Sequence, residues 1–225
     1  IIHLKKSEKK DIIFDYDISY DNEGIKSGAK TKYYPGELSE IINKIKGDKK
    51  RYAVVGVPCF IKSLRNITNI DKLLNEQLKV YVGLVCGHFK TLNYARMLAL
   101  QSNINPDTLD FIDFRYKTGK GKASDYNTYF EYISDGKKSS KIGLPSAKLY
   151  GTDWGIGYLK YNACDFCDDV VADTADVVFG DAWIKPYIDD PKGTNIVIVR
   201  NMKYDHIFRN GADNQELTIR EVSND

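Results

Sequence analysis

The sequence lacks the marks of several large classes of protein. No apolar run approaches the ~20 residues that span a bilayer, and the mean hydropathy is −0.43. Thirty-three basic residues stand against 31 acidic ones, and a net charge of +2 gives no field that would indicate nucleic-acid binding. The first residues do not resemble a secretory leader, and there is no internal repeat. The composition is therefore that of a globular protein, and its 225 residues can build one good-sized core or two small domains.

Cysteine is scarce, and its four copies are unevenly placed. Cys164 and Cys167 form a C-x-x-C pair, whereas Cys59 and Cys86 stand alone. Without a leader, so few cysteines favour a reducing cytoplasm over a disulfide scaffold. The chain also opens without methionine, in a strand-like segment, so we expect a fragment of a longer cytoplasmic protein that lacks its N-terminal part.

The first 110 residues alternate between helical and strand patterns. Residues 35–47, "PGELSEIINKIKG", place apolar side chains on one helical stripe between a proline and a glycine. The runs 51–57 and 79–87 are β-branched and apolar, which is typical of strands buried on both faces. Further helices are expected in 60–67, 71–78 and 91–103. This alternation predicts a mostly parallel sheet flanked by helices.

The pattern changes near residue 109. Segments 109–117 and 126–134 are strand-like, and Asp135-Gly136 supplies a hairpin turn. Buried strands return at 175–183 and 194–200. The prediction is an α/β fold in a single domain over 1–225, with an antiparallel hairpin insertion at about 109–150.

The cysteines follow the predicted strands. Open α/β sheets bind ligands beyond the carboxyl ends of their strands. Cys59 and Cys86 follow two such ends, and the C-x-x-C pair directly precedes a third strand. We therefore expect three segments to bring four thiols to one edge of the sheet.

Spacing alone leaves the chemistry of these thiols open. A lone buried cysteine is most often a small hydrophobe. A redox dithiol is disfavoured, because acidic residues rather than a helix start follow Cys167. A structural zinc site usually has two C-x-x-C knuckles, whereas a 4Fe-4S cluster needs four thiolates and tolerates irregular spacing. Zinc and iron–sulfur both remain.

Five segments together resemble one family. "VVGVPCFIKSLR", "VGLVCGH", "DFRYKTG", "CDFCDDVVADTADVVFGDAW" and "KGTNIVIVR" occur in the order found in the coenzyme F-420 hydrogenase/dehydrogenase beta-subunit family. The resemblance covers about residues 30 to 200 and is expected to indicate a bacterial member. It implies an iron–sulfur flavoprotein, an oxidoreductase that passes electrons between a 4Fe-4S cluster, FAD and a soluble hydride carrier. The family's cluster cysteines fall on Cys59, Cys86, Cys164 and Cys167.

The same resemblance implies a flavin site. Two cations on one strand face, Arg115 and Lys117, suit a flavin pyrophosphate or a reduced flavin ring, although the bare motif "RYKTGKGK" reads as a solvated loop. The remaining candidates follow strand ends or precede a strand: Gly56, Val57, Pro58, Gly180, Asp181, Trp183, Thr194 and Asn195. A turn explains Gly56 and Pro58 equally well, an N-cap is the alternative for Asp181, and core packing is the favoured explanation of Trp183. Val57 and Phe60 depart from the threonine and glutamine that are commoner in the family. His88 is expected to stand beside the thiolates without binding a metal.

Three functions are open on the sequence. The leading one is electron transfer, with coenzyme F-420 as a candidate substrate and an electron-donor protein or ferredoxin-like domain as partner. The second is a zinc-stapled structural or interaction domain built on the four cysteines. The third keeps the fold and cluster but reduces another metabolite linked to polysaccharide synthesis. Neither nucleic acid nor a membrane span is expected, and homo- or hetero-oligomers are open.

Overall fold

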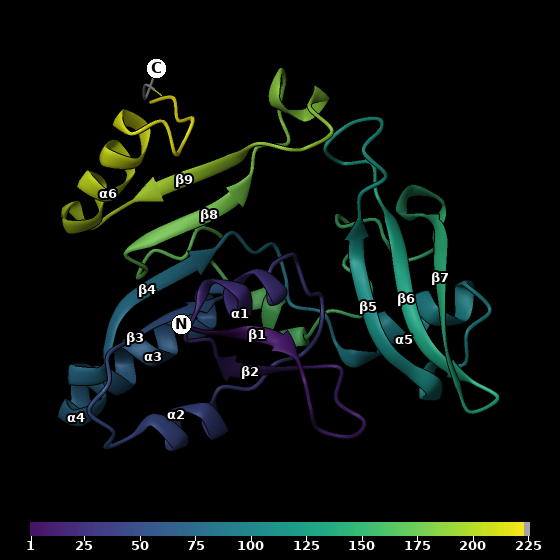
Figure 1. Ribbon diagram of the computed structural model, residues 1–225, viewed down its shortest axis with the longest axis horizontal. Helices are drawn as coiled ribbons and strands as arrows, with labels where there is room; N and C mark the ends of the chain where they lie inside the picture. The colour runs from purple at the N-terminus through teal and green to yellow at the C-terminus, as the bar shows by residue number, and fades with distance from the viewer. Residues whose placement is uncertain (223–225) are drawn as a thin grey trace.

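The computed structural model describes residues 1–222, which form two β-sheets with helices packed against them (Figure 1). The larger sheet has six strands, in the spatial order β2 (Phe14–Ile18), β1 (Ile2–Lys6), β3 (Tyr52–Gly56), β4 (Leu78–Leu84), β8 (Val177–Asp181) and β9 (Asn195–Val199). The neighbouring pairs from β1 to β8 are parallel, and both edge strands are antiparallel to their neighbours. The predicted α/β class with a mostly parallel sheet is confirmed.

Helices that precede and follow β3 along the chain build the first core. The helices of this part are α1 (Asn22–Ser27), α2 (Ser39–Ile45), α3 (Pro58–Ile70), α4 (Lys72–Gln77) and α6 (Met202–Asp213). The apolar stripes of α2, α3 and α4 place Ile45, Ile61 and Leu74 against Val54 and Tyr81 of the sheet, all of them at most 1% exposed. Burying each large aliphatic side chain contributes about 1.5–3 kcal/mol, so this contact fixes the helices on the sheet.

The predicted insertion is a separate three-stranded antiparallel sheet. Its strands are β5 (Leu109–Tyr116), β6 (Asn127–Ser134) and β7 (Lys137–Pro145), in that order. The β6–β7 turn has positive φ at Asp135 (51°) and Gly136 (75°), as a two-residue hairpin turn requires. Helix α5 (Leu92–Gln101) packs on this sheet, and Leu98, Phe114 and Phe130 form the centre of the second core.

Three local expectations were wrong. Helix α2 begins at Ser39 rather than Pro35, and the chain before it passes so close to β1 at Gly36 that a Cβ there would lie 2.7 Å from Leu4 Cδ1. Strand β9 is an edge strand, and its Ile196 is 46% exposed. Along β3 only alternate residues are fully buried, so its second face is covered incompletely.

A buried carboxylate joins a strand of the larger sheet to two of the helices that pack on it. Asp176, which is 6% exposed and precedes β8, accepts from the Tyr81 backbone N–H of β4 at 2.8 Å and from Asn201, the N-cap of α6, at 2.9 Å. Arg65 of α3 completes the set with an ion pair at 3.0 Å. Buried polar groups are stable when all their hydrogen bonds are made, so Asp176 fixes the relative positions of α3, β4 and α6.

No helix among residues 1–222 has the length and apolar character needed to cross a membrane.

Gly83 of β4 is expected to tolerate no side chain. A Cβ at this position would lie 2.4 Å from the Cβ of Ala172 and 3.0 Å from that of Ala175. Overpacking of this kind costs about 1–3 kcal/mol, so Gly83→Ala should lower the free energy of unfolding by that amount in urea denaturation. Gly155→Ala is the control, because its Cβ would meet only the flexible Asp153 carboxylate at 3.3 Å. Equal stability of the two variants would contradict the close packing at Gly83.

Candidate functional site

Two of the four cysteines follow adjacent parallel strands. Gly56 of β3 pairs with Gly83 of β4, and Cys59 and Cys86 each lie three residues farther along the chain. Because the carboxyl ends of parallel strands meet at one edge of a sheet, the register of a single strand pair brings these cysteines to the same edge.

Cys59 lies in the first turn of α3. Val57 is the N-cap and Pro58 the first helical residue, so the tight turn expected there is a helix start. Burial of the sulfur and the negative charge of Cys167 and Cys164 raise the pKa of the Cys59 thiol, whereas the backbone N–H groups of Phe60 and Cys59 lower it. The helix start therefore partly stabilises a thiolate at this position.

The C-x-x-C segment is fixed to the chain that follows β4. Backbone hydrogen bonds join Cys86 N–H to Val170 O at 2.9 Å and Tyr161 N–H to Phe89 O at 3.0 Å. The Phe89 N–H also donates to the Cys164 sulfur at 3.3 Å. Segment 86–91 thus forms a short ladder with 159–170, and this ladder brings the pair Cys164–Cys167 to the edge where Cys86 lies.

The four sulfurs influence one another electrostatically. Burial raises the pKa of the Cys86 thiol to about 12, and negative charge on Cys59, Cys164 and Cys167 contributes to the rise. All four cysteines are free, so no disulfide competes for them. In residues 1–222, no three His, Cys, Asp or Glu side chains are placed to hold a single metal ion. The structure thus brings four free thiols to one region, and two of them, Cys59 and Cys86, become harder to deprotonate there unless a cation offsets the charge.

Arg115, at the end of β5, joins the two sheets. Its Nη1 donates to Asp181 Oδ2 of β8 at 2.7 Å and to Thr31 Oγ1 at 3.2 Å, and its side chain is only 12% exposed. Burial alone would lower the pKa of Arg115, but the hydrogen bond and charge of Asp181, together with Tyr33 and Tyr126, raise it. Both hydrogen bonds use one nitrogen of a group with five N–H donors, so further donors are left for an incoming acceptor.

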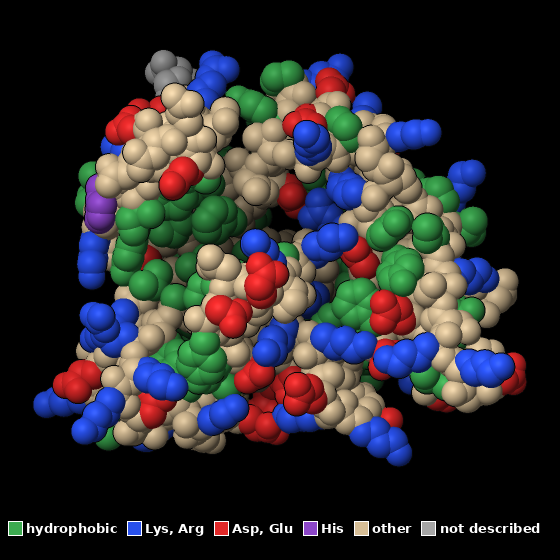
Figure 2. Space-filling view, viewed as in Figure 1, with side chains coloured by type: hydrophobic (Ala, Val, Ile, Leu, Met, Phe, Trp, Pro, Cys, Tyr) green, Lys and Arg blue, Asp and Glu red, His purple; other side chains and the backbone are tan. Residues whose placement is uncertain are grey.

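Aromatic side chains surround this cation. The guanidinium lies 5.0 Å from the Trp183 ring and 5.3 Å from the Tyr126 ring, both within cation–π range. Trp183 is 41% exposed, so the expectation that it packs in the core is wrong. Figure 2 shows a hollow near the centre of the molecule with acidic and basic side chains around it, in the region between β8–β9 and β5.

Lys117 lies just beyond β5, on the same side as Arg115. Its ammonium is 5.7 Å from the Tyr126 ring and donates to the Ala123 carbonyl of its own loop. Burial, followed by the charge of Arg115, lowers the pKa of Lys117. Gly119 and Gly121 both have positive φ, which lets the loop turn back on itself. The two predicted cations are therefore neighbours.

The sequence also matches a known protein family over most of its length. The family model for the C-terminal part of the coenzyme F420 hydrogenase/dehydrogenase beta subunit matches residues 49–225. The chain belongs to this family. Membership supports a redox role, and it confirms the resemblance carried by the five sequence segments.

The relatives of this F420 hydrogenase/dehydrogenase family member have low sequence identity to it, and their chains are longer. An uncharacterized protein of Methanocaldococcus jannaschii is 23% identical over 215 residues, which are 91% of this chain and 51% of that protein. A chain of the F420-reducing NiFe hydrogenase complex from Methanosarcina barkeri matches the fold with a TM-score of 0.62 at 15% identity, covering 95% of this chain and 66% of the other. The chain thus spans about half the length of its curated relative.

The other predicted flavin residues of this family member also make contacts that support the fold. A Cβ at Gly180 would lie 2.5 Å from Val85 Cγ2, so glycine permits the close packing there. Asn195 pairs with Asp181 in the β8–β9 ladder, and the Thr194 carbonyl accepts from the Ala182 N–H at 2.9 Å. Asp181 is an ion-pair partner rather than an N-cap. These contacts place the residues near Arg115.

Sequence reasoning missed a buried lysine beside the cysteine ladder. Lys90 is 1% exposed, and its Nζ donates to the Tyr158 carbonyl at 2.6 Å while lying 4.5 Å from the Trp154 ring and 4.6 Å from the Tyr94 ring. His88 stacks on Trp154 at 4.3 Å, its Nε2 is buried without a hydrogen-bond partner, and burial lowers its pKa to about 4. The run "CGHFKT" alone did not indicate that aromatic rings surround Lys90 and His88, because Trp154 comes from a distant loop.

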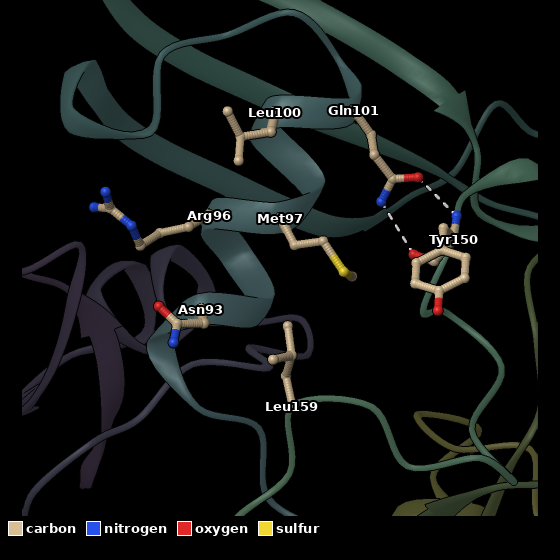
Figure 3. Close-up of a pocket in the computed structure, with 7 residues that line it drawn as sticks. All are labelled: Asn93, Arg96, Met97, Leu100, Gln101, Tyr150 and Leu159. Carbon is tan, nitrogen blue, oxygen red and sulfur yellow. Dashed lines mark hydrogen bonds between the residues drawn. The ribbon is translucent and has the colours of Figure 1, made fainter.

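A second missed feature is a surface pocket of about 430 Å³ over α5 (Figure 3). Gln101 spans one side, exchanging hydrogen bonds with the Tyr150 backbone at 3.0 and 2.7 Å. None of the predicted cysteine or flavin residues lines it, so it is separate from the candidate site.

Lys90 should make stability depend on alkaline pH. Burial lowers its pKa from 10.5 to about 8, so between these values the unfolded chain binds more protons than the folded one, and the folded state gains stability as pH rises. The free energy of unfolding of the wild type minus that of Lys90→Met should increase across this window, with a slope of at most about 1.4 kcal/mol per pH unit.

Lys137→Met is the control for the loss of one lysine, because Lys137 is exposed at the start of β7 and lies outside this ladder. Urea titrations of the wild type and of both variants across this pH range give the comparison. A difference between the wild type and Lys90→Met that does not rise with pH would show that the amine is not buried.

Proposed function

We propose that this chain is the electron-transfer part of an oxidoreductase of the F420 hydrogenase/dehydrogenase beta-subunit family. It would hold a 4Fe-4S cluster and FAD and exchange electrons with a soluble hydride carrier, for which coenzyme F420 is the first candidate. The observation that supports this proposal is that three separate segments bring all four free cysteines to one edge of the sheet, where the charge of the other cysteines contributes to raising the pKa of Cys59 and of Cys86.

The donor set fits an iron–sulfur group. Four thiolates repel one another unless cations offset their charge, and ligation by four cysteines is what a 4Fe-4S cluster requires. Such a cluster supplies one-electron transfer when bound. Cys59, Cys86, Cys164 and Cys167 would be its ligands, the start of α3 stabilises the Cys59 thiolate, and the Phe89 N–H donates to Cys164.

The cations beside the second sheet fit an anionic, planar ligand such as FAD. Arg115 would donate its remaining N–H groups to flavin oxygens, and Asp181 holds the guanidinium in place. Lys117 adds a second positive charge, and the half-exposed Trp183 ring offers an apolar surface. These residues would position FAD and balance its charge, and FAD would supply the exchange between single electrons and hydride.

The proposal predicts iron bound through the cysteines. Full-length protein purified without oxygen should be brown and contain about four irons per chain. Cys164→Ser should lose most of this iron but keep FAD, because Cys164 is not among the residues around Arg115. Metal analysis and the visible spectrum measure both. Colourless protein with one zinc per chain would support the zinc-stapled structural domain instead.

FAD retention should depend on Arg115 and Lys117. A charge-assisted hydrogen bond is worth ~1.5–3 kcal/mol, so Arg115→Ala and Lys117→Ala should each weaken FAD binding roughly ten- to a hundredfold. The iron content should stay unchanged in both. Lys120→Ala, an exposed change in the same loop, is the control for loss of charge. Full FAD affinity in both cation variants would assign them to a solvated loop.

A further inference from the structure

The opposite edge of the larger sheet carries a basic pocket. Its cavity is about 620 Å³, within the range of small-molecule sites. Tyr52 and Ala53 begin β3, Lys79 and Val80 lie near the start of β4, and Ile1 precedes β1. The cysteines follow the carboxyl ends of these same strands, so the pocket and the proposed electron-transfer site are at opposite edges (Figure 1).

Four cations line this pocket without a carboxylate among the lining residues: Lys50, Arg51, Lys79 and Lys203. Within residues 1–222, none of them forms an ion pair. The carboxylate of nearby Asp48 is already engaged by the Tyr52 hydroxyl at 2.5 Å and by the Gln77 amide at 2.8 Å. Like charges gathered in one pocket repel one another, and a bound anion would remove that repulsion.

A helix start and three aromatic rings complete the pocket. Lys203 and Tyr204 are the second and third residues of α6, whose amino end carries partial positive charge. The Tyr204 hydroxyl donates to the Lys79 carbonyl at 3.1 Å, which fixes α6 against β4. Tyr20 is 68% exposed and has the Lys50 ammonium 4.6 Å from its ring.

We infer that this pocket binds a small oligophosphate anion. Phosphate oxygens are the acceptors that an arginine fork, clustered lysines and a helix amino end bind together. The source of the phosphates is either a nucleotide, whose base would stack on Tyr20 or Tyr204, or an inorganic polyphosphate. The inference is independent of the proposed electron transfer.

The test is calorimetric titration of the full chain with ATP and with sodium tripolyphosphate at physiological salt. One-to-one binding of at least one probe is expected. Lys50→Glu/Arg51→Glu should weaken it at least tenfold, since each lost charge-assisted bond costs about that factor. Lys79→Ala/Lys203→Ala, from two other elements, should also weaken it, which guards against a local folding defect in the first variant.

Two controls make the result specific. Lys137→Glu/Lys148→Glu changes the net charge by the same amount at exposed positions outside the pocket and should leave the affinity unchanged. Arg115→Ala should also leave it unchanged, because Arg115 lies beside the other edge. ATP binding tighter than tripolyphosphate, with the surplus lost in Tyr20→Ala, would identify the nucleotide as the source, and equal affinities would identify the phosphates alone.

Three outcomes would overturn the inference: neither probe binds, the Lys137/Lys148 control weakens binding as much as the pocket variants do, or Arg115→Ala removes the binding while the pocket variants keep it. The last outcome would place the anion at the proposed flavin residues instead, and it would leave the electron-transfer proposal standing.

Discussion

The parallel pairing of β3 with β4 is the constraint on which the candidate site depends, because it sets where two of the four cysteines emerge. The pair Gly56–Gly83 ends both strands at the same level, and the chain then turns into α3 on one side and into the 86–91 segment on the other. The 159–170 segment hydrogen-bonds to 86–91 and so inherits its position. A register slip of one residue between β3 and β4 would therefore displace Cys59 relative to the other three thiols.

The candidate site depends secondly on the ion pair between Arg115 and Asp181, which connects the two sheets. Exposed ion pairs contribute little to stability, but the Arg115 side chain is only 12% exposed and two rings cover it. In such surroundings the carboxylate fixes the direction of the guanidinium more than it adds free energy. The Trp183 and Tyr126 rings lie 5.0 and 5.3 Å from the same guanidinium, so cations and rings reach one region from elements far apart in the chain.

The two edges of the larger sheet gather different chemical groups. The carboxyl edge has four thiols and the Arg115–Asp181 ion pair, whereas the amino edge has four lysine and arginine side chains and a helix start. A small net charge of +2 conceals this division, because composition sums over surfaces that never meet. The family relationship supports a redox role for the chain, and it says nothing about the basic edge.

Local pattern was sufficient for the central strands, for α3 to α5 and for the β6–β7 turn, because each depends on neighbouring residues: apolar runs, helical stripes and Asp135-Gly136. The same reasoning placed Cys59 and Cys86 at strand ends, since parallel strands share an edge. It placed a strand at the opening of the chain, where β1 forms, but it assigned neither β2 nor α1, and it predicted β9 as buried although β9 is an edge strand.

What the sequence by itself determined is the α/β class, the family and the cysteines as a set. Tertiary structure alone decided which side chains meet. Lys90 reaches the Trp154 ring, Arg115 reaches Asp181, and Lys50 shares a pocket with Lys203, across separations of 64, 66 and 153 residues respectively. Periodicity reports which face of an element is apolar, but the partner of a polar or charged side chain depends on strand order, and strand order is a property of the folded chain as a whole.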